Sequence, residues 1–291
     1  MTPARGQSGA FHTAGRRQRP GKAGSVAAAA WRLLCLVLLC GLSLQLYFVA
    51  RIAMMTVLAP QSTTFQRSEA WRLVVDKQQI TWSQTWVDGD RISVNLKRAV
   101  IASEDAGFAD HDGVDWDALE KAWEKNQRAE ALAERRNAQL AKQPQKKPTT
   151  KLPDPSTTSA QAPRRTVEPK VIGGSTISQQ LTKNLFLSGE RTVLRKAQEF
   201  ILTLALEALI DKRRILEIYL NSVEWGEGVF GAQAAARHYF RSDAARLDAY
   251  AAARLAVMLP APKRFEKNPG SAYIAGRAAT IVARMAAVAV P

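Results

Sequence analysis

Residues 101–115 read IASEDAGFADHDGVD and place two adjacent carboxylates, Glu104 and Asp105, at the end of a predicted helix. Helical spacing puts Leu96, Val100 and Glu104 on one face of that helix, and Asp105 points about 100° away. Apolar neighbours would desolvate the Glu104 carboxylate and raise its pKa. A carboxyl group of that kind suits a general acid or base.

The residues after this pair favour a functional interpretation. The simplest alternative is two solvated carboxylates in the last turn of a helix that stops at Gly107. Phe108, His111, Gly113 and Asp115 complete the pattern E-D-x-x-F-x-x-H-x-G-x-D, which is far more specific than the pair alone.

Composition and charge limit the class of protein. The chain has 291 residues, of which 46% are hydrophobic, so it can bury a sizeable core and hold one catalytic domain with appendages. Its net charge of +15 predicts anionic partners. Nucleic acid, anionic lipid and diphosphate substrates all fit that charge.

The N-terminal segment predicts a membrane anchor. Residues 1–32 carry arginines and lysines without an acidic residue, and we interpret them as a basic cytoplasmic tail. Residues 33–58 are almost entirely apolar and predict a single transmembrane helix. The remainder is then exported. A cleavable signal peptide is the alternative, but no convincing small-residue cleavage site follows the apolar run.

Cysteine and histidine usage argues against disulfides and zinc. Cys35 and Cys40 both fall inside the predicted anchor, so the exported part has neither a disulfide nor a thiolate ligand. His12, His111 and His238 are too scattered to suggest a metal site. We therefore predict no protein-bound metal.

Two segments break up the exported part. Residues 59–91 are expected to be a connector with one short strand at 71–75, and Trp82 and Trp86 either rest at the lipid interface or pack on the catalytic domain. A catalytic domain then covers 92–291. The helical pattern continues from Trp116 through residue 142. Residues 143–171 are rich in proline, lysine and threonine and predict a disordered loop, which we expect to be merely solvated.

Residues 173–184, GGSTISQQLTKN, predict a capped helix. The Ser-Thr pair resembles an N-terminal cap, and free amides at such an end favour anions. Gln179 and Lys183 share one face, beside Gln180 and Asn184 and opposite an apolar stripe that begins at Ile177. An ordinary amphipathic helix has the same pattern.

Basic residues and a second carboxylate follow. Arg195 and Glu199 lie one helical turn apart, and Glu199 borders an apolar run, so a partly buried carboxylate is expected there. An isolated pair of this kind is usually only a minor helix stabiliser. Residues 246–259 and 272–287 predict two further packing helices, which are rich in alanine.

Four motifs in this order resemble the peptidoglycan glycosyltransferases of family 51. They are E-D-x-x-F-x-x-H-x-G-x-D from Glu104, G-G-S-T-I-S-Q-Q-x-x-K-N from Gly173, R-K-x-x-E from Arg195 and K-x-x-I-L-E-x-Y-L-N from Lys212. The short chain is most similar to the monofunctional biosynthetic peptidoglycan transglycosylases of that family. Neither S-x-x-K nor K-T-G occurs, so a penicillin-binding transpeptidase domain is not indicated.

The resemblance implies a mainly α, lysozyme-like domain behind one anchor, with the domain on the periplasmic side of a bacterial inner membrane. Its implied reaction polymerises lipid II onto a lipid-linked glycan, with Glu104 as the general base. Glu199 matches the second family carboxylate, and Asp105 orients the first motif. The implied substrate-binding residues are Ser175, Gln179, Gln180, Lys183, Asn184, Arg191, Arg195 and Lys196.

The resemblance also bears on cofactors and partners. A diphosphate leaving group needs countercharge, which the cations supply without a tightly bound cofactor, although a divalent cation (Mg²⁺ or Mn²⁺) would serve the same purpose. The implied partners are the membrane, the lipid-linked substrates and other cell-wall synthesis and division proteins, with no nucleic acid. In this chain Gly107 stands where the family often has a cation, and the proline-rich loop is longer than usual.

Two other functions fit parts of the sequence. A lysozyme-like hydrolase or lytic enzyme would also use one glutamate in a helical fold, but it has no use for a cluster of cations at a neutral leaving group. A membrane-tethered protein that binds polyanions through its basic loop would leave the four ordered motifs unexplained.

Overall fold

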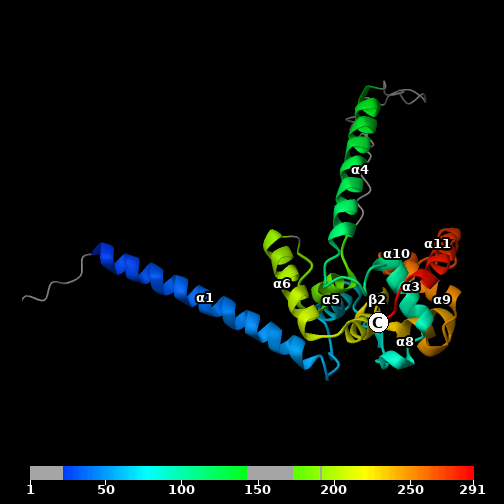
Figure 1. Cartoon of the computed structure of the whole chain (residues 1–291), viewed down its shortest axis with the longest axis horizontal. Helices are drawn as coiled ribbons and strands as arrows, with labels where there is room; N and C mark the ends of the chain where they lie inside the picture. Colours follow the sequence, from blue (N-terminus) through cyan, green and yellow to red (C-terminus); the bar gives the residue numbers. More distant parts are fainter. Residues whose placement is uncertain (1–21, 143–172, 191) are drawn as a thin grey trace, which may run out of the picture. The chain divides into compact units, whose positions relative to one another are not determined.

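A computed structural model describes residues 22–142, 173–190 and 192–291 of the chain (Figure 1). It divides into two compact units, Met1–Tyr47 and Phe48–Pro291. The expected disordered loop at 143–171, most of the expected cytoplasmic tail and Arg191 lie outside the described residues.

Helix α1, Lys22–Met54, covers most of the segment 33–58 that we expected to be the anchor. Its segment Val26–Met54 is long and apolar enough to cross a membrane. Large apolar side chains such as Leu36 and Leu39 are exposed along it, as lipid contact requires. The last two turns of the helix belong to the second unit, where Ile52 is fully buried.

Residues 59–91, expected to be a connector, contain helical elements that belong to the second unit. Thr63 and Gln66 form a reciprocal capping box that starts helix α2, Thr64–Arg72, and a π-helical turn η1, Leu73–Lys77, continues it. The predicted strand at 71–75 is therefore wrong. Glu69 and Leu73, one helical turn apart, both face the interior, and this spacing requires a helix.

The two tryptophans that follow pack on the domain. Trp82 stacks on Phe230 with 4.5 Å between ring centroids, and the guanidinium of Arg214 lies 5.7 Å from the ring centre of Trp86. The second of the two alternatives for these residues is thus confirmed. Strand β1, Ser83–Gln84, joins the same surface by pairing with β3.

The domain contains a small three-stranded sheet. Its order is β1-β3-β2, where β3 is Val229–Phe230 and β2 is Glu224–Gly226. β1 runs parallel to β3 and β2 antiparallel to it. The turn between β2 and β3 needs Gly228, which has φ +73° and would bring a Cβ atom to 1.9 Å from the Thr81 carbonyl oxygen.

The core is built from helices, which confirms the mainly α fold. Helix α3, Val94–Glu104, buries Leu96, Val100 and Ile101 completely against α9 and α11. Helix α5, Ile177–Phe186, packs on α6, Val193–Leu209, and on α7, Lys212–Ser222. The other helical elements are η2 Gly89–Arg91, α4 Trp116–Lys142, α8 Ala232–Phe240, η3 Ala244–Arg246, α9 Ala249–Met258, α10 Pro262–Phe265, α11 Ala272–Arg284 and η4 Met285–Ala287. The alanine-rich helices expected at 246–259 and 272–287 are α9 and α11.

Candidate active site

Glu104 is the last residue of α3, and its surroundings desolvate it. The side chain is partly accessible, but protein surrounds the carboxylate. Burial raises its pKa above the usual range, hydrogen bonds from Gln180 and Ser103 oppose the shift, and the Asp105 charge adds to it. The prediction of a desolvated carboxyl group at this position is confirmed.

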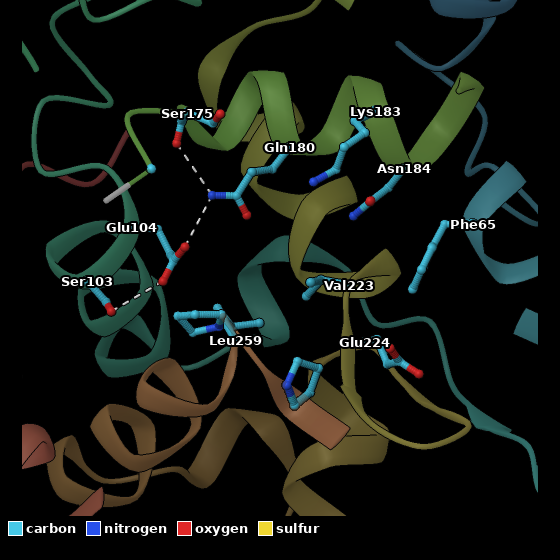
Figure 2. Close-up of a pocket in the computed structure, with 13 residues that line it drawn as sticks. Phe65, Ser103, Glu104, Ser175, Gln180, Lys183, Asn184, Val223, Glu224 and Leu259 are labelled. Atoms are coloured by element: carbon cyan, nitrogen blue, oxygen red, sulfur yellow. Dashed lines mark hydrogen bonds between the residues drawn. The ribbon is translucent and has the colours of Figure 1, made fainter. Parts of the chain in front are cut away.

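A partly buried chain of hydrogen bonds orients Glu104. The amide nitrogen of Gln180 donates to Oε2 of Glu104 at 3.1 Å, and the hydroxyl of Tyr219 donates to the amide oxygen of Gln180 at 3.0 Å. Tyr219 is 1% exposed and comes from α7, so three helices converge here. With its oxygen already occupied by Tyr219, Gln180 directs its amide nitrogen toward the Glu104 carboxylate and the Ser175 carbonyl (Figure 2).

Asp105 links the first motif to α5. Its Oδ2 accepts from the backbone N–H of Ile177 at 2.9 Å, and its Oδ1 lies 2.9 Å from Nε2 of His111. The N-terminus of α5, where we expected an anion, is thus contacted by a carboxylate of the protein itself. Thr176 caps this end and donates its hydroxyl to the Gly113 carbonyl at 2.6 Å. Asp105 therefore holds the Glu104 segment against α5.

A cleft of about 460 Å³ opens beside Glu104. Figure 2 shows Lys183 and Asn184 one turn beyond Gln180 on α5, on the same side of the helix as Glu104. Apolar side chains close the opposite wall. The residues that line the cleft are Phe65, Ser103, Glu104, Gly173, Ser175, Gln180, Lys183, Asn184, Val223, Glu224, Leu259, Pro260 and Pro262.

A smaller pocket of about 140 Å³ shares one wall with this cleft. Both are lined by Ser175, Gln180 and Lys183. The smaller pocket adds residues that the sequence predicted to bind substrate, namely Gln179, Arg195 and Lys196, together with Glu199. The structure therefore gathers nearly all predicted site residues in two adjoining cavities.

Glu199 anchors the cationic side chains of the smaller pocket. We expected a partly buried carboxylate at this position, and Glu199 is 3% exposed. Its Oε2 accepts from Nη1 of Arg195 at 3.0 Å, and its Oε1 accepts from the ammonium of Lys196. Within the described part of the chain, Nε of Arg195 is buried without a hydrogen-bond partner. This N–H is an unused donor beside the pocket.

The protonated form of Lys183 is disfavoured by burial and by two nearby cations. Its side chain is reached from the cleft, yet the surrounding protein desolvates the ammonium and lowers its pKa. The Glu199 charge opposes this shift, whereas Arg195 and Lys196 reinforce it. An anion placed next to these cations would relieve both the desolvation and the mutual repulsion.

Three of the predicted site residues differ from the rest. Asp105 lines neither of the two cavities. Gln179 is buried, and its amide oxygen accepts from the backbone N–H of Thr176 at 3.2 Å, so it closes the cap of α5 while lining the smaller pocket. Arg191 lies outside the described residues.

Sequence reasoning missed the far wall of the cleft and the residue behind Gln180. Phe65, Val223, Leu259, Pro260 and Pro262 have no motif of their own, and only the fold brings them to the cleft. Tyr219 and Glu224 lie in or just after the K-x-x-I-L-E-x-Y-L-N motif. That proximity was the one indication available in the sequence.

Comparison with known proteins agrees with this arrangement. A model of the transglycosylase family matches residues 73–145 and 155–286. The chain is 46% identical over 269 residues to the biosynthetic peptidoglycan transglycosylase of Burkholderia multivorans, covering 92% of this chain and 90% of that protein. It is 43% identical over 286 residues to the protein of the same name from Paraburkholderia phytofirmans, covering 96% and 99%.

Proposed function

This chain belongs to the transglycosylase family and is a peptidoglycan glycosyltransferase with that family's lysozyme-like fold, and we propose that it polymerises lipid II with Glu104 as the general base. The growing lipid-linked glycan is the donor, and lipid II is the acceptor. The hydroxyl on C4 of the acceptor sugar attacks the anomeric carbon of the donor. Its proton passes to Glu104, the bond to the α-linked diphosphate breaks, and a β-1,4 linkage forms with release of undecaprenyl diphosphate.

The observation that carries this proposal is the shared wall of the two cavities. Ser175, Gln180 and Lys183 line both the cleft that contains Glu104 and the pocket that contains Arg195 and Lys196. A base and a set of cations on adjoining walls match a reaction in which one group loses a proton while another leaves as an anion.

The raised pKa of Glu104 supports its role as the base. A carboxylate whose pKa is raised by burial is a better proton acceptor near neutral pH than a solvated one. The Gln180 hydrogen bond occupies Oε2 of Glu104. Oε1 has only a weak 3.4 Å contact from the Ser103 hydroxyl, so we assign Oε1 to the acceptor hydroxyl.

The cations supply the countercharge for the leaving group. Lys183, Arg195 and Lys196 surround one small pocket, and the unpartnered Nε of Arg195 offers a further donor. Arginine and lysine bind diphosphate oxygens through short, charge-assisted hydrogen bonds. Arg191, which precedes this helix in the sequence, is assigned to the same task by the family resemblance.

A divalent cation is proposed only as a companion of the substrate. Among the described residues, no group of three or more histidine, cysteine, aspartate or glutamate side chains is placed to hold a metal ion. A Mg²⁺ or Mn²⁺ ion would therefore be ligated chiefly by the diphosphate oxygens. Its chemistry there would be charge neutralisation at the leaving group.

The location follows from the anchor and the reaction. The helix Val26–Met54 is a candidate membrane span, and the basic residues before it favour a cytoplasmic N-terminus. We therefore place the catalytic domain on the periplasmic face of the inner membrane, where its lipid-linked substrates would be available. Enzymes that cross-link or divide the wall would use its glycan product and are the expected protein partners.

The test is incubation of the detergent-solubilised full chain with purified lipid II, followed by separation of polymer from undecaprenyl diphosphate. Glu104→Gln keeps the size of the side chain but cannot accept the proton, so we expect polymer formation to fall by at least about 10³-fold. Glu130→Gln is the matched control, because Glu130 is exposed on α4 and lines neither cavity, and it should retain full activity.

The outcomes separate the candidate reactions. Near-normal polymerisation by Glu104→Gln would reject its assignment as the base. Cleavage of preformed glycan without polymer formation would favour the hydrolase alternative. A normal melting curve for the variant is required, since the substitution preserves shape and removes a charge whose burial is unfavourable.

A further inference from the structure

A separate pocket of about 380 Å³ lies at the end of the candidate membrane span. Arg51 and Arg67 provide its charges, Met54, Met55 and Leu58 provide apolar surface, and none of its lining residues is acidic. All of them belong to the compact unit Phe48–Pro291. The complete lining is Arg51, Met54, Met55, Leu58, Ala59, Pro60, Gln61, Ser62 and Arg67.

The length of the span places this pocket at the depth of lipid headgroups. The candidate span Val26–Met54 has 29 residues. At about 1.5 Å per residue it is roughly 43 Å long, which matches a bilayer of about 40–45 Å measured across both headgroup layers. Its last turn, which carries Arg51, therefore lies among headgroups rather than acyl chains.

Exposed apolar side chains continue past Arg51. Met54 is 56% exposed, Val57 is 80% exposed and Leu58 is 55% exposed. Such side chains are favourable next to acyl chains and unfavourable in water. Cations and bare apolar surface in one pocket complement a molecule that has an anionic head and a hydrocarbon tail.

Arg67 is held at the rim, and no acidic side chain of the described residues pairs with it. Its guanidinium donates to the side-chain hydroxyls of Ser62 at 3.1 Å and Thr64 at 2.9 Å, which are neutral acceptors. These bonds fix the planar group without neutralising it, so N–H groups remain for a further acceptor. Guanidinium groups bind phosphate oxygens in pairs, a geometry that lysine does not reproduce.

We propose that this Arg51–Arg67 pocket binds the phosphate of an anionic glycerophospholipid, whose acyl chains run back into the bilayer beside the span. The bound lipid would fix the depth and orientation of the catalytic unit at the membrane surface. This site is separate from the cleft of Glu104, because the two cavities share no lining residue.

Native mass spectrometry of the full chain in detergent provides the test. Phosphatidylglycerol is titrated against the wild type and the double variant Arg51→Gln/Arg67→Gln, and we expect at least about a tenfold weaker apparent affinity in the variant, since two charge-assisted contacts are lost. Arg277→Gln is the matched control, an exposed arginine on α11 outside the pocket, and should bind as the wild type does. Arg67→Lys keeps the charge but loses the paired N–H groups of the guanidinium. Its affinity for phosphatidylglycerol should lie between those of the wild type and the double variant.

Competing lipids identify the ligand. Zwitterionic phosphatidylethanolamine should bind at least about tenfold more weakly than phosphatidylglycerol, because its ammonium opposes the arginines. Equal binding of the two lipids, exclusive binding of undecaprenyl phosphate, or unchanged phosphatidylglycerol affinity in the double variant would each overturn the proposal. Polymerisation of lipid II in detergent should persist in the double variant. If the double variant lost both polymerisation and lipid binding, the two arginines would stabilise the fold and the proposal would fail.

Discussion

The amide nitrogen of Gln180 lies 3.1 Å from the carboxylate Oε2 of Glu104, although 76 positions separate the two residues in the sequence. The contact joins the C-terminal end of α3 to the first turns of α5. It sets both the direction of the carboxylate and the strength with which that carboxylate holds a proton. Several measurable properties of the enzyme depend on it.

Replacing Gln180 by methionine should shift the pH dependence of catalysis upward. The Gln180 hydrogen bond lowers the pKa of Glu104 against the effect of burial, so its removal raises that pKa further. A general base must be deprotonated, and the acidic limb of kcat/KM against pH should therefore move to higher pH. A steady-state pH profile with lipid II checks this. An unmoved limb would show that another group controls it.

Tyr219→Phe should produce the same shift on a smaller scale. The variant keeps the buried ring and removes only the hydroxyl that donates to the Gln180 oxygen at 3.0 Å. Gln180 remains, but its amide is free to rotate. We expect about 1 kcal/mol of lost stability from the unpaired amide oxygen, measured as a lower Tm. A fall in activity with no change in the pH profile would argue that Tyr219 does not act through Gln180.

Lys183→Gln should reduce kcat/KM by about 10²-fold or more, because a cation that meets developing charge on the leaving group contributes at the transition state. Lys267→Gln is a suitable control, since Lys267 is exposed and far from the motifs in sequence. Both variants are assayed with lipid II at low and saturating concentration. Should only KM change, Lys183 would bind the diphosphate equally before and during its departure.

Asp105→Ala should destabilise the protein by about 2–4 kcal/mol, because it leaves the Ile177 N–H and the His111 ring without their shared partner. Thermal unfolding provides the measurement. The neighbouring Asp110→Ala removes an exposed carboxylate from the same loop and should have little effect. A stable Asp105→Ala variant that is inactive would instead point to a direct role for Asp105 in the reaction.

Glu224→Gln should stabilise the protein increasingly, relative to wild type, as pH rises. Burial raises the pKa of Glu224 to about 7, the Lys263 ammonium at 3.5 Å opposes this, and the charge of Glu69 adds to it. The folded protein therefore retains a proton that the unfolded chain has lost, and the free energy of unfolding falls as pH rises from about 4.5 to about 7.

This cost amounts to about 3 kcal/mol above pH 7, and glutamine does not incur it. The Tm of the variant, relative to wild type, should thus increase between pH 5 and pH 8. The glutamine variant of exposed Glu130 should show no such trend. A constant difference for Glu224→Gln would mean that this carboxyl group is ionised throughout.

The sequence by itself determined the local structure of the site. The apolar stripe that ends at Glu104 predicted both a buried α3 and a desolvated carboxylate, because helical periodicity is a property of neighbouring residues. The Ser-Thr pair before Ile177 likewise predicted a capped helix, with Gln180 and Lys183 on its polar face. The strand predicted at 71–75 is wrong, because the helix that begins at the Thr63 capping box and its π-helical continuation cover these residues.

Only the tertiary structure decided what these elements do to one another. No periodicity indicates that Gln180 donates to Glu104, that Asp105 contacts the end of α5, or that Phe65 and Pro262 close the cleft, because each contact joins segments far apart in the chain. The same holds for Arg51 and Arg67 at the end of the candidate membrane span. Local patterns place charges on helix faces, but their pKa values and partners depend on which faces meet when the core packs.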